Sequence, residues 1–499
     1  MLPIPLYLGE DNRNRVSATR TVQPTESMKT IITSNWRPLD RALCTLLLGI
    51  AAVWAMPKSA RAQLYNAKAV EVPSRKVKIK RHFSKTYFVL FTAALLINLY
   101  AAGYHLAFSS LKGPNFPALL ATVNVFVTIL VRNEIFLNVL YRVLVKACSP
   151  LQLPIAIKNR VTSGLLHLGG IHAGCAVASL VWLAIGLFYL LSEGPADKRW
   201  VNLPLLSAML ACLTITCVTA LPAVRRRYHD LFEHTHRFLG WSALLLLWAN
   251  VLLTANDSPQ AGAVGPLAAM PKNASFWLTV AITALVLSPW LTVRKVQVQA
   301  RVLSRAVIEI TFPGGSEPGT FGRISRHALA DWHAFALFAG TRGAVSHSMV
   351  ISGLGDFTKG LIITPPAALY VRTVKFPGLP CCVPMYRRSI IIATGAGMVP
   401  YLSLLTILPR GSHRLIWIGR SFRECFGSNL CDFVFQWPNV VLVDTTSGAR
   451  PDVTALAVAH YRSFEADAVF VGSNPEGTSQ IVSGCRALGI PAFGPSWDS

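Results

Sequence analysis

Long apolar runs separated by short polar segments dominate the first three hundred residues of the chain. Seven runs stand out, at residues 42–56, 86–108, 115–131, 164–191, 204–222, 237–254 and 275–293. Five or six of them are long enough to cross a hydrocarbon core of ~30 Å at about 1.5 Å per residue. The first run is marginal and fits either a short span or an interfacial segment. The pattern predicts a transmembrane domain of six to seven helices over residues 41–293.

The pattern changes after residue 293, where alternation with a period of two replaces the long apolar runs. The stretch KVQVQARVLSRAVIEITFP and the Gly/Pro turns after it are typical of antiparallel strands, so residues 294–380 are predicted to form a small β-barrel. Residues 381–499 alternate apolar strands with helices, which predicts a parallel α/β nucleotide-binding domain. The expected strands are residues 390–394, 415–418, 440–443 and 468–471, with a last short one near Ile490.

Basic residues between the apolar runs predict the orientation of the helices. Three connecting segments carry nine, five and four Lys or Arg, and the three intervening segments carry one, two and one. The basic set is 57–85, 132–163 and 223–237, and the other set is 109–116, 192–203 and 255–274. By the positive-inside rule the basic set is cytosolic. The domains after residue 293 are therefore also expected in the cytosol.

Composition supports a membrane protein and argues against two other classes. The chain is 52% hydrophobic and only 14% charged, with a mean hydropathy of +0.45. Its formal charge of +24 lies mostly between apolar runs, so topology explains it better than nucleic-acid binding does. The ten cysteines are scattered without a CxxC pair, which fits reduced thiols rather than a disulfide framework. Residues 1–40 are polar and prolyl, and we expect them to be disordered.

Two local patterns carry more specific expectations. Between the third and fourth runs, an apolar stripe lies opposite Asn138, Arg142 and Lys146, which predicts an amphipathic helix on the inner membrane surface. Further on, RSIIIATGAGMVPYLS predicts a buried strand, a tight turn and a helix start. Gly395 and Gly397 would let the backbone approach a ligand, and Pro400 suits the first turn of the helix. Such a turn attracts phosphate.

Histidines near the cytosolic ends of two predicted spans form a candidate metal site. His167 and His172 begin one span, and His236 begins another, with His229 and His234 just before it. Two helices thus offer imidazoles at the same depth, as a site holding haem iron between two histidines needs. The alternative is that they are interfacial and only hydrogen-bonded, which we favour for His229 and His234. His105 is alone on its span and is expected to be a packing residue.

The chain resembles the ferric reductase and NADPH oxidase superfamily. The resemblance covers roughly residues 85–499 and is carried by YHDLFEHTHRFLGW, DWHAFAL, GDFTKGL, ATGAGMVPYLS, WIGR and DTTSGARPD. Within it, GGIHAG, WHAFA and GIPAFGPSWDS look most like the fungal TmpA-type membrane flavoproteins. The resemblance implies a ferric-reductase-like membrane bundle followed by a ferredoxin-reductase-like module that binds FAD in the barrel and NADP in the α/β domain.

The resemblance also implies which residues hold the flavin. His333 and Phe335 of WHAFA would contact the flavin, although Ala336 lacks the hydroxyl that the family has at that place. His347, Ser348, Thr358 and Lys359 occupy the region where the family's barrel meets the pyrophosphate. Lys359 and a turn of free N–H groups suit that charge.

For the nucleotide, the resemblance implies contacts on both sides of the Gly-rich turn. Gly395, Gly397 and Pro400 look like the family's nucleotide loop, with Ser403 following in the helix. Arg420 would meet the adenosine 2′-phosphate, which favours NADP over NAD.

Arg450 of GARPD is a further candidate for contact with the nucleotide, and Trp497 would either stack on the flavin as the catalytic aromatic or belong to a frayed tail. The family's Cys-Gly-Pro appears here as Val471-Gly472-Ser473-Asn474, so the thiol is missing.

The family's second haem is not expected here. Its ligands would lie 13 or 14 residues beyond the first pair, where this chain has Leu180 or Val181 and Ala249 or Asn250. A single inner haem b through His167 or His172 with His236 stays open.

The expected function is that of a membrane-bound, NADPH-dependent flavoprotein oxidoreductase that acts in fungal metabolite biosynthesis or development. Its electron acceptor is unidentified and is expected to be lipophilic or a metabolite. The alternative is a degenerate, non-catalytic scaffold or sensor. Expected partners are membrane lipid and an adenylate-forming or other biosynthetic enzyme, because similar domains occur fused to adenylate-forming modules. The expected location is the plasma membrane or endoplasmic reticulum, with the C-terminal domains cytosolic.

Overall fold

The computed structural model describes residues 85–109, 113–149, 152–192, 196–257, 262, 265–339, 345–446, 448 and 451–495. The predicted disordered region 1–40 and the apolar run 42–56 lie outside these residues, as do Arg450 and Trp497. Expectations about these parts of the chain therefore stay predictions.

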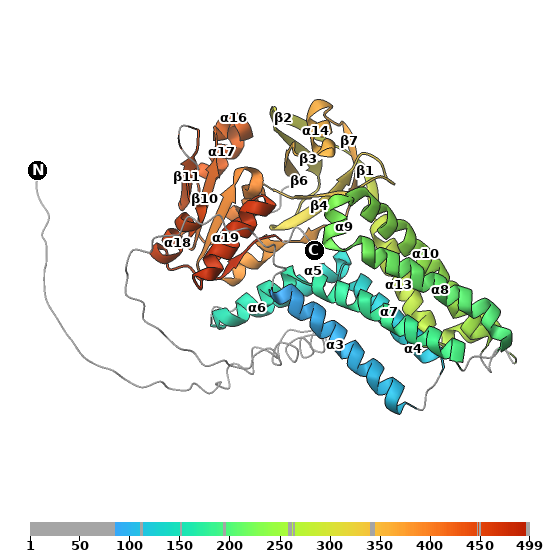
Figure 1. The fold of residues 1–499 in the computed structure, drawn as a ribbon. Helices are drawn as coiled ribbons and strands as arrows, with labels where there is room; N and C mark the ends of the chain where they lie inside the picture. Colours follow the sequence, from blue (N-terminus) through green and yellow to red (C-terminus); the bar gives the residue numbers. More distant parts are fainter. Residues whose placement is uncertain are drawn as a thin grey trace, which may run out of the picture. The chain divides into compact units, whose positions relative to one another are not determined.

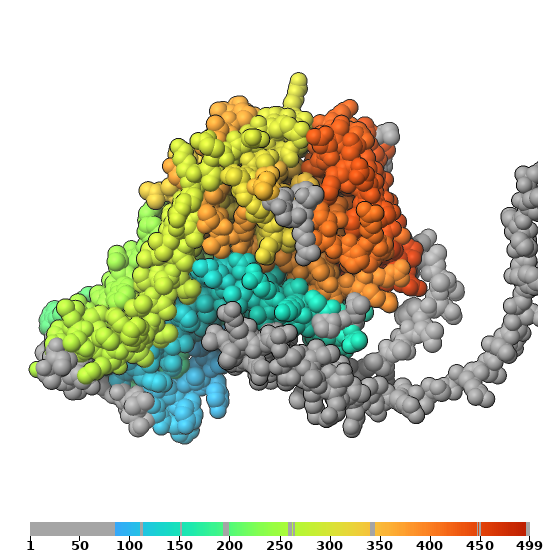
Figure 2. Space-filling model, turned by 180° about the vertical axis from the view of Figure 1, so that it is seen from behind, coloured from blue at the N-terminus to red at the C-terminus, as the bar shows by residue number. Residues whose placement is uncertain are grey.

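Helices make up the first part of the described chain (Figure 1, blue to yellow-green). They are α3 (Lys85–Phe108), α4 (Asn115–Leu130), α5 (Glu134–Cys148), α6 (Ile155–Leu166), α7 (Gly169–Ser192), α8 (Ala196–Thr219), α9 (Pro222–Arg227), α10 (His229–Asn256), α12 (Pro266–Ala269), η1 (Met270–Lys272) and α13 (Ala274–Leu291). Among the described residues, five helices are long and apolar enough to cross a membrane: α3, α7, α8 from Arg199, α10 and α13. Large apolar side chains such as Ile97, Leu245 and Leu291 are exposed on them. Figure 2 shows one side of this helical surface in green to yellow-green.

The core of the helical part gathers around α7. Trp182 and Leu183 of α7 are fully buried against Ala121 of α4, Leu247 of α10 and Ile282 of α13. On another face of α7, a Cβ at Gly170 or Gly174 would strike backbone atoms of α3, so glycine lets the two helices approach closely. The predicted helical bundle is therefore present, and whether it crosses a membrane stays a prediction.

Two predicted spans are interrupted. The run 115–131 forms α4, and α5 follows it after a bend of 71°. If α4 and α5 together form one span, the described residues contain six candidate spans instead of five. The bend is stable because the Asn133 side chain accepts hydrogen bonds from the backbone N–H groups of Ile135 and Phe136 and so starts a new helix. The run 164–191 is broken at His167, where α6 ends and α7 begins two residues later.

The residues predicted as a barrel form two antiparallel sheets. The first contains β1 (Val293–Gln297), β4 (Thr320–Ser325), β5 (His333–Ala336), β7 (Ala368–Arg372) and β8 (Phe376–Pro377), and the second contains β2 (Gln299–Ser304), β3 (Val307–Pro313) and β6 (Ser346–Ser352). A short helix, α14 (Asp356–Ile363), follows β6. Both sheets contribute to one core, in which Ile310 and Met349 of the second sheet meet Ile324 and Leu369 of the first. The period-two pattern thus predicted the strands and the antiparallel pairing.

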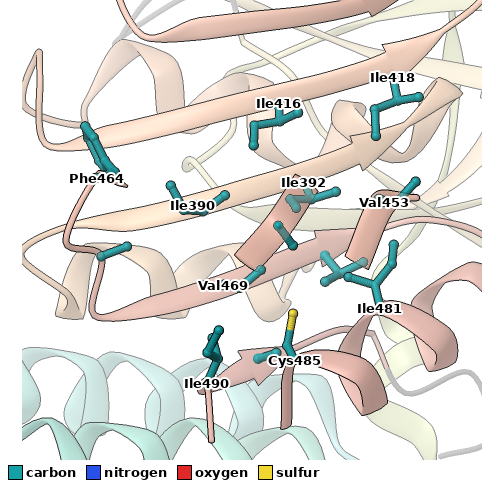
Figure 3. Packing of buried hydrophobic residues seen from close by; sticks show 14 residues of the cluster. Ile390, Ile392, Ile416, Ile418, Val453, Phe464, Val469, Ile481, Cys485 and Ile490 are labelled. Carbon is teal, nitrogen blue, oxygen red and sulfur yellow. The ribbon is translucent and has the colours of Figure 1, made fainter. Parts of the chain in front are cut away.

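The last part is a parallel α/β domain. Its sheet has the order β11-β10-β9-β12-β13, with every pair parallel. The strands are β9 (Ser389–Thr394), β10 (His413–Gly419), β11 (Val440–Asp444), β12 (Ala468–Gly472) and β13 (Ala492–Phe493), and the helices are η2 (Leu379–Met385), η3 (Gly395–Met398), α15 (Val399–Leu402), η4 (Ser403–Thr406), α16 (Phe422–Phe426), α17 (Ser428–Phe435), α18 (Val453–Ser463) and α19 (Pro475–Ala487). On one face of the sheet, Ile390, Ile416 and Val469 pack toward Val453 of α18 and Ile481 of α19 (Figure 3).

The amphipathic helix predicted at the membrane surface is α5, but its polar side has a different neighbour from the one expected. Asn138 donates to the carbonyl oxygen of Lys375 (2.6 Å), and Arg142 lies 3.7 Å from Glu317. Asn138 therefore contacts the connection before β8, while Arg142 and Glu317 stay mostly exposed to solvent. The position of α5 at a membrane surface stays a prediction.

His413, at the start of β10, gives a pH-dependent prediction for stability. Its imidazole is 2% exposed and lies 2.7 Å from the Ser389 hydroxyl oxygen, and burial lowers its pKa from 6.5 to about 4 in spite of Asp467 nearby. Between those pH values the unfolded chain binds a proton that the folded chain does not, so acidification weakens the fold by up to about 3 kcal/mol.

We expect the melting temperature of His413→Asn to fall much less between pH 7 and pH 4 than that of wild type. The exposed His327→Asn control should keep it. Parallel pH curves for wild type and His413→Asn would contradict the assignment.

Candidate functional site

The candidate site lies where the strand order of the parallel sheet reverses. β9 is the central strand, the next strand β10 lies on one side of it, and β12 lies on the other. The chain therefore leaves the carboxyl ends of β9 and β12 in adjacent turns, and nucleotides bind at such switch points in parallel sheets. The turn after β9 holds Gly395 and Gly397, and the turn after β12 holds Ser473.

The two turns touch each other directly. A Cβ on Gly397 would overlap the carbonyl group of Gly472, and a Cβ on Gly472 would overlap the carbonyl oxygen of Gly397. The hydroxyl oxygens of Thr394 and Ser473 are 2.7 Å apart and link the same turns. Gly397 is thus required for contact between the turns, and its role in the approach of a ligand stays a prediction. The Thr394–Ser473 pair was missed because its members are far apart in sequence.

Gly395 fits its predicted role better. Its backbone has φ of +53°, a conformation that favours glycine, and a Cβ there would meet open space. Its carbonyl oxygen accepts a hydrogen bond of 2.9 Å from the Trp417 indole, which holds the turn against β10. The turn is therefore fixed from one side and open on the other.

The helix predicted behind the Gly-rich turn is much shorter than expected. Pro400 does lie in the first turn of α15, but α15 has only four residues and is flanked by the 3₁₀ turns η3 and η4. Ser403 is 1% exposed, and its hydroxyl accepts a hydrogen bond of 3.0 Å from the backbone N–H of Gly319. Ser403 therefore joins this domain to the antiparallel sheets, and the prediction that it contacts the nucleotide is not supported by its position.

Arg420 occupies the predicted place at the end of β10 and is exposed. The next residue, Ser421, has φ of +41°, and its N–H donates to the Thr446 hydroxyl (2.9 Å). Thr446 in turn donates to Asp444 at the end of β11, and these hydrogen bonds lower the pKa of the Asp444 carboxyl. The backbone on which Arg420 sits is thus well anchored, while its side chain faces solvent.

Asn474 replaces a residue of the family's thiol motif, and the structure gives it a local role. Its side-chain oxygen accepts a hydrogen bond of 2.7 Å from the N–H of Gly477 and so caps α19. The departure from the motif therefore stabilises the start of a helix beside Ser473.

On the flavin side, the structure brings His333 and Phe335 together with a third ring. The Phe357 ring stacks on His333 at 3.9 Å between centroids and lies 6.5 Å from Phe335, nearly parallel to it. Burial lowers the pKa of His333, so the neutral ring is favoured. Phe357 was missed as a site residue because α14 follows β5 by twenty residues, although the motif GDFTKGL contains it.

Two unpaired donors lie close to these rings. The Arg372 guanidinium carbon is 4.8 Å from the ring centre of Trp332, the residue before His333. The Arg372 Nε and the Trp332 indole N–H are both buried, and neither has a hydrogen-bond partner among the described residues. Buried donors normally find acceptors. The pair therefore fits the phosphate or carbonyl oxygens of a bound flavin, and sequence reasoning had not singled it out.

The other predicted flavin contacts have structural partners instead. His347 Nδ1 lies 2.5 Å from the carbonyl oxygen of Gly314, just after β3. The hydroxyl oxygen of Ser348 lies 2.9 Å from the hydroxyl oxygen of Thr311, between β6 and β3. Thr358 accepts hydrogen bonds of 3.0 Å from the N–H groups of Leu354 and Gly355. The N–H groups expected to bind pyrophosphate are therefore capped by Thr358, and of this set Lys359 is the exposed residue.

The structure brings together two of the three predicted iron ligands. The rings of His172 and His236 lie 6.4 Å apart between centroids, and His172 Nδ1 lies 2.9 Å from the Thr128 carbonyl oxygen. His167 instead ends α6, with Nδ1 2.6 Å from the Ser163 carbonyl oxygen. Over the described residues, no group of three or more His, Cys, Asp or Glu could hold a metal ion. Two facing imidazoles fit an axial haem pair, and haem binding stays a prediction.

The comparisons with known proteins point to one group of reductases. Residues 379–499 match the family model described as adenylate-forming reductase 03009, C-terminal domain. The chain is 37% identical over 383 residues to adenylate-forming reductase 03009 of Coprinopsis cinerea, and 36% identical over 389 residues to adenylate-forming reductase 06235 of the same species. These alignments cover 75% and 76% of this chain but 36% and 37% of the relatives. The chain thus spans about a third of the length of the curated relatives it matches.

Solved structures give more distant similarities. One is the ferredoxin reductase in carbazole 1,9a-dioxygenase, at 17% identity and a TM-score of 0.33, covering 41% of this chain and 70% of that chain. Another is the FAD/NAD-binding domain of nitric oxide dioxygenase from Vibrio cholerae, at 14% identity and a TM-score of 0.29, covering 40% of this chain and 99% of that chain. Neither similarity bears on function. The predicted fold class is confirmed in part, by the antiparallel sheets and the parallel α/β domain described above.

The relatives contradict the function predicted from the sequence. That prediction was a membrane flavoprotein of the ferric reductase type with a lipophilic or metabolite acceptor, or a non-catalytic scaffold in its place. The relatives and the matching family model are adenylate-forming reductases, so the prediction is wrong. A strand followed by a glycine turn, as in ATGAGMVPYLS, is typical of a nucleotide-binding fold, and fold does not determine function. The TmpA-type resemblance, the membrane location and the partners are untested and stay predictions.

Proposed function

We propose that this chain carries the reducing part of an adenylate-forming-reductase activity, with NADPH as the electron donor and a flavin as the first acceptor. In this proposal, adenylate formation is carried out by a segment or partner equivalent to the part of the relatives that this chain does not match. Support comes from the identity of 37% over 383 residues and from the match of residues 379–499 to the C-terminal domain of such a reductase.

The observation that carries the proposal is the paired turn at the switch point of the parallel sheet. Gly397 and Gly472 hold the turns in contact, and the Thr394–Ser473 hydrogen bond closes them at 2.7 Å. Gly395 leaves open space where a nicotinamide nucleotide would lie. The chain's own groups would orient the nucleotide, while the bound nicotinamide and flavin supply the hydride chemistry.

For the flavin, the candidate cradle combines rings and donors. His333, Phe335 and Phe357 offer flat apolar surface, and Trp332 and Arg372 offer buried N–H groups without partners. Because a buried donor without an acceptor costs about 1–3 kcal/mol, a bound flavin would relieve that cost.

The flavin assignment is tested by titrating FAD into the purified full chain. We expect Arg372→Gln to weaken FAD binding by about tenfold, since the loss of one charge-assisted hydrogen bond costs about 1.5–3 kcal/mol. Arg301→Gln, which breaks an exposed pair with Glu309 on the other sheet, should leave FAD binding unchanged. Equal FAD affinity in all three proteins, or none in wild type, would overturn the proposed flavin site.

Arg420 gives a prediction for coenzyme choice. Its exposed guanidinium lies at the end of β10, where the 2′-phosphate of NADPH would be placed. We expect Arg420→Ala to raise the KM for NADPH about tenfold or more and to leave the KM for NADH unchanged, because only NADPH carries that phosphate. The measurement is flavin reduction with each coenzyme.

The matched control is Arg423→Ala on the same connection, because Arg423 already pairs with Asp432 at 2.6 Å. This variant should keep the wild-type ratio of the two KM values. A ratio that Arg420→Ala leaves at the wild-type value would show that Arg420 does not read the phosphate.

A further inference from the structure

Arg372 lies at the corner where the last long helix, α13, continues into the first antiparallel sheet. α13 ends at Leu291, and β1 begins two residues later at Val293, which pairs with Arg372 of β7. The backbone N–H of Thr373 donates to the carbonyl oxygen of Thr292 (3.0 Å), so the pairing continues up to the end of the helix. The register of β1 with β7 therefore fixes the backbone of Arg372 beside the end of α13.

The first antiparallel sheet also brings the start of β5 to this corner. Ile324 of β4 pairs with His333 of β5 on one side and with Val371 of β7 on the other. A single strand therefore separates the two strands that carry Trp332 and Arg372 at their ends. The Arg372 side chain spans this separation, because its guanidinium carbon lies 4.8 Å from the ring centre of Trp332.

A second aromatic ring reaches the same guanidinium from the helical part. Trp290, in the last turn of α13, has its ring centre 5.7 Å from the guanidinium carbon of Arg372. The Trp290 ring is itself in edge-to-face contact with Trp241 of α10, at 6.0 Å between centroids. A cation within about 6 Å of a ring centre is attracted by the electrons of the ring. Arg372 is therefore held by one ring from the sheet and by one ring from the helices.

This double contact matters because Arg372 carries a buried donor that is not used. Its Nε–H has no hydrogen-bond partner in the part of the chain that the structure describes. A long arginine side chain loses rotamer entropy when a ligand fixes it in one conformation. Contacts that already restrict the side chain in the free protein reduce this loss, and binding becomes tighter without a new contact to the ligand.

From these contacts we infer that Trp290 is a positioning residue of the flavin site, which holds Arg372 in the orientation that meets an acceptor oxygen of the flavin. The flavin site is then completed by the end of α13, one of the candidate spans, and not by the antiparallel sheets alone. The inference rests on the proposed function, because the ligand of Arg372 is the flavin proposed above.

The test measures the dissociation constant of FAD for the full chain in detergent, from the change in FAD fluorescence on binding. Trp290→Leu removes the ring and keeps an apolar side chain at this half-buried position. We expect it to weaken FAD binding about fivefold, which corresponds to about 1 kcal/mol. Trp290→Phe keeps an aromatic ring beside the guanidinium and should bind FAD within about twofold of wild type.

The matched control is Trp277→Leu at the other end of the same helix. The Trp277 side chain is exposed, and its indole donates to the carbonyl oxygen of Pro271 (2.9 Å), far along the chain from the sheet. This variant makes the same substitution in α13 and should leave the dissociation constant of FAD unchanged.

A double-mutant cycle separates positioning from a general structural role. If Trp290 acts through the guanidinium, Trp290→Leu should have no further effect on FAD binding in a chain that already carries Arg372→Gln. A residue that only stabilises the corner of the fold would give the same fivefold loss in both backgrounds.

The inference is overturned if Trp290→Leu binds FAD as tightly as wild type, if Trp290→Phe loses as much affinity as Trp290→Leu, or if the loss is the same with Arg372→Gln present. In each of these cases wild type still binds FAD, so the proposed flavin site stands. A wild-type chain that binds no FAD overturns the flavin site and the inference together. Melting temperatures show whether each variant is folded, and Trp290→Met, with the same expected loss, replaces Trp290→Leu if that variant does not fold.

Discussion

Replacing Gly397 with alanine is expected to destabilise the α/β domain by about 3 kcal/mol and to abolish nucleotide binding. The added Cβ would overlap the carbonyl group of Gly472, which belongs to the backbone and has no rotamer to escape into. Inserting a group into a packed site costs about 1–3 kcal/mol, and the cost lies at the upper end when backbone atoms must move. Because Gly397 and Gly472 hold the two switch-point turns together, separating them also removes the surface on which the nucleotide would lie.

The control for this prediction is Gly395→Ala, two residues away. Gly395 has positive φ, so alanine costs about 1 kcal/mol there, but its Cβ meets no other atom. Thermal unfolding and NADPH titration of both variants make the comparison. Equal losses for the two variants would show that contact between the turns is not what Gly397 provides.

Replacing Glu134 with glutamine is expected to have the second-largest effect, a loss of about 3 kcal/mol at the contact between α5 and β4. Glu134 is 7% exposed and pairs with Arg323. Removing one member of a buried ion pair costs about 3–5 kcal/mol because the other charge is left uncompensated. The Arg323 side chain is 33% exposed, so water screens part of this cost and the lower end applies.

Glu317→Gln tests whether burial is the cause. Glu317 pairs at 3.7 Å with Arg142, which lies on α5 like Glu134, but the side chains of Glu317 and Arg142 are both more than 70% exposed. Removing this charge should cost less than about 1 kcal/mol. The measurement is the melting temperature at low and at high salt, and an equal decrease in the two variants would contradict the assigned role of Glu134.

The sequence predicted elements whose signal is local. The apolar runs, the Ile390–Ile392 strand and the alternation in β3 each depend on a few neighbouring residues, and the structure has helices and strands in those places. Gly395 was recognised for the same reason, because a strand followed by a glycine turn is visible within ten residues.

Residue roles that depend on distant partners could not be predicted. Gly397 is explained by Gly472, and Ser403 by Gly319, and nothing in the local sequence identifies either partner. The same holds for Phe357, whose ring covers His333 only after β5 and α14 have come together. The pairing of His172 with His236 was anticipated because both lie at the same depth of neighbouring helices, which is a regular feature of a bundle.

The function could not be predicted correctly because reductase classes share the elements that the motifs describe. The turn at Gly395 and the strand before it build a nucleotide site in many proteins, whatever the final acceptor is. What distinguishes this chain is its identity to adenylate-forming reductases over three-quarters of its length.

Hydride transfer at the paired turns is tested most directly by rapid mixing of the FAD-loaded full chain with NADPH. The account predicts that flavin absorbance near 450 nm bleaches in wild type and in Gly395→Ala, and that it does not bleach in Gly397→Ala at a temperature where that variant is folded. A wild-type protein that holds FAD but leaves it oxidised with both NADPH and NADH would contradict the account.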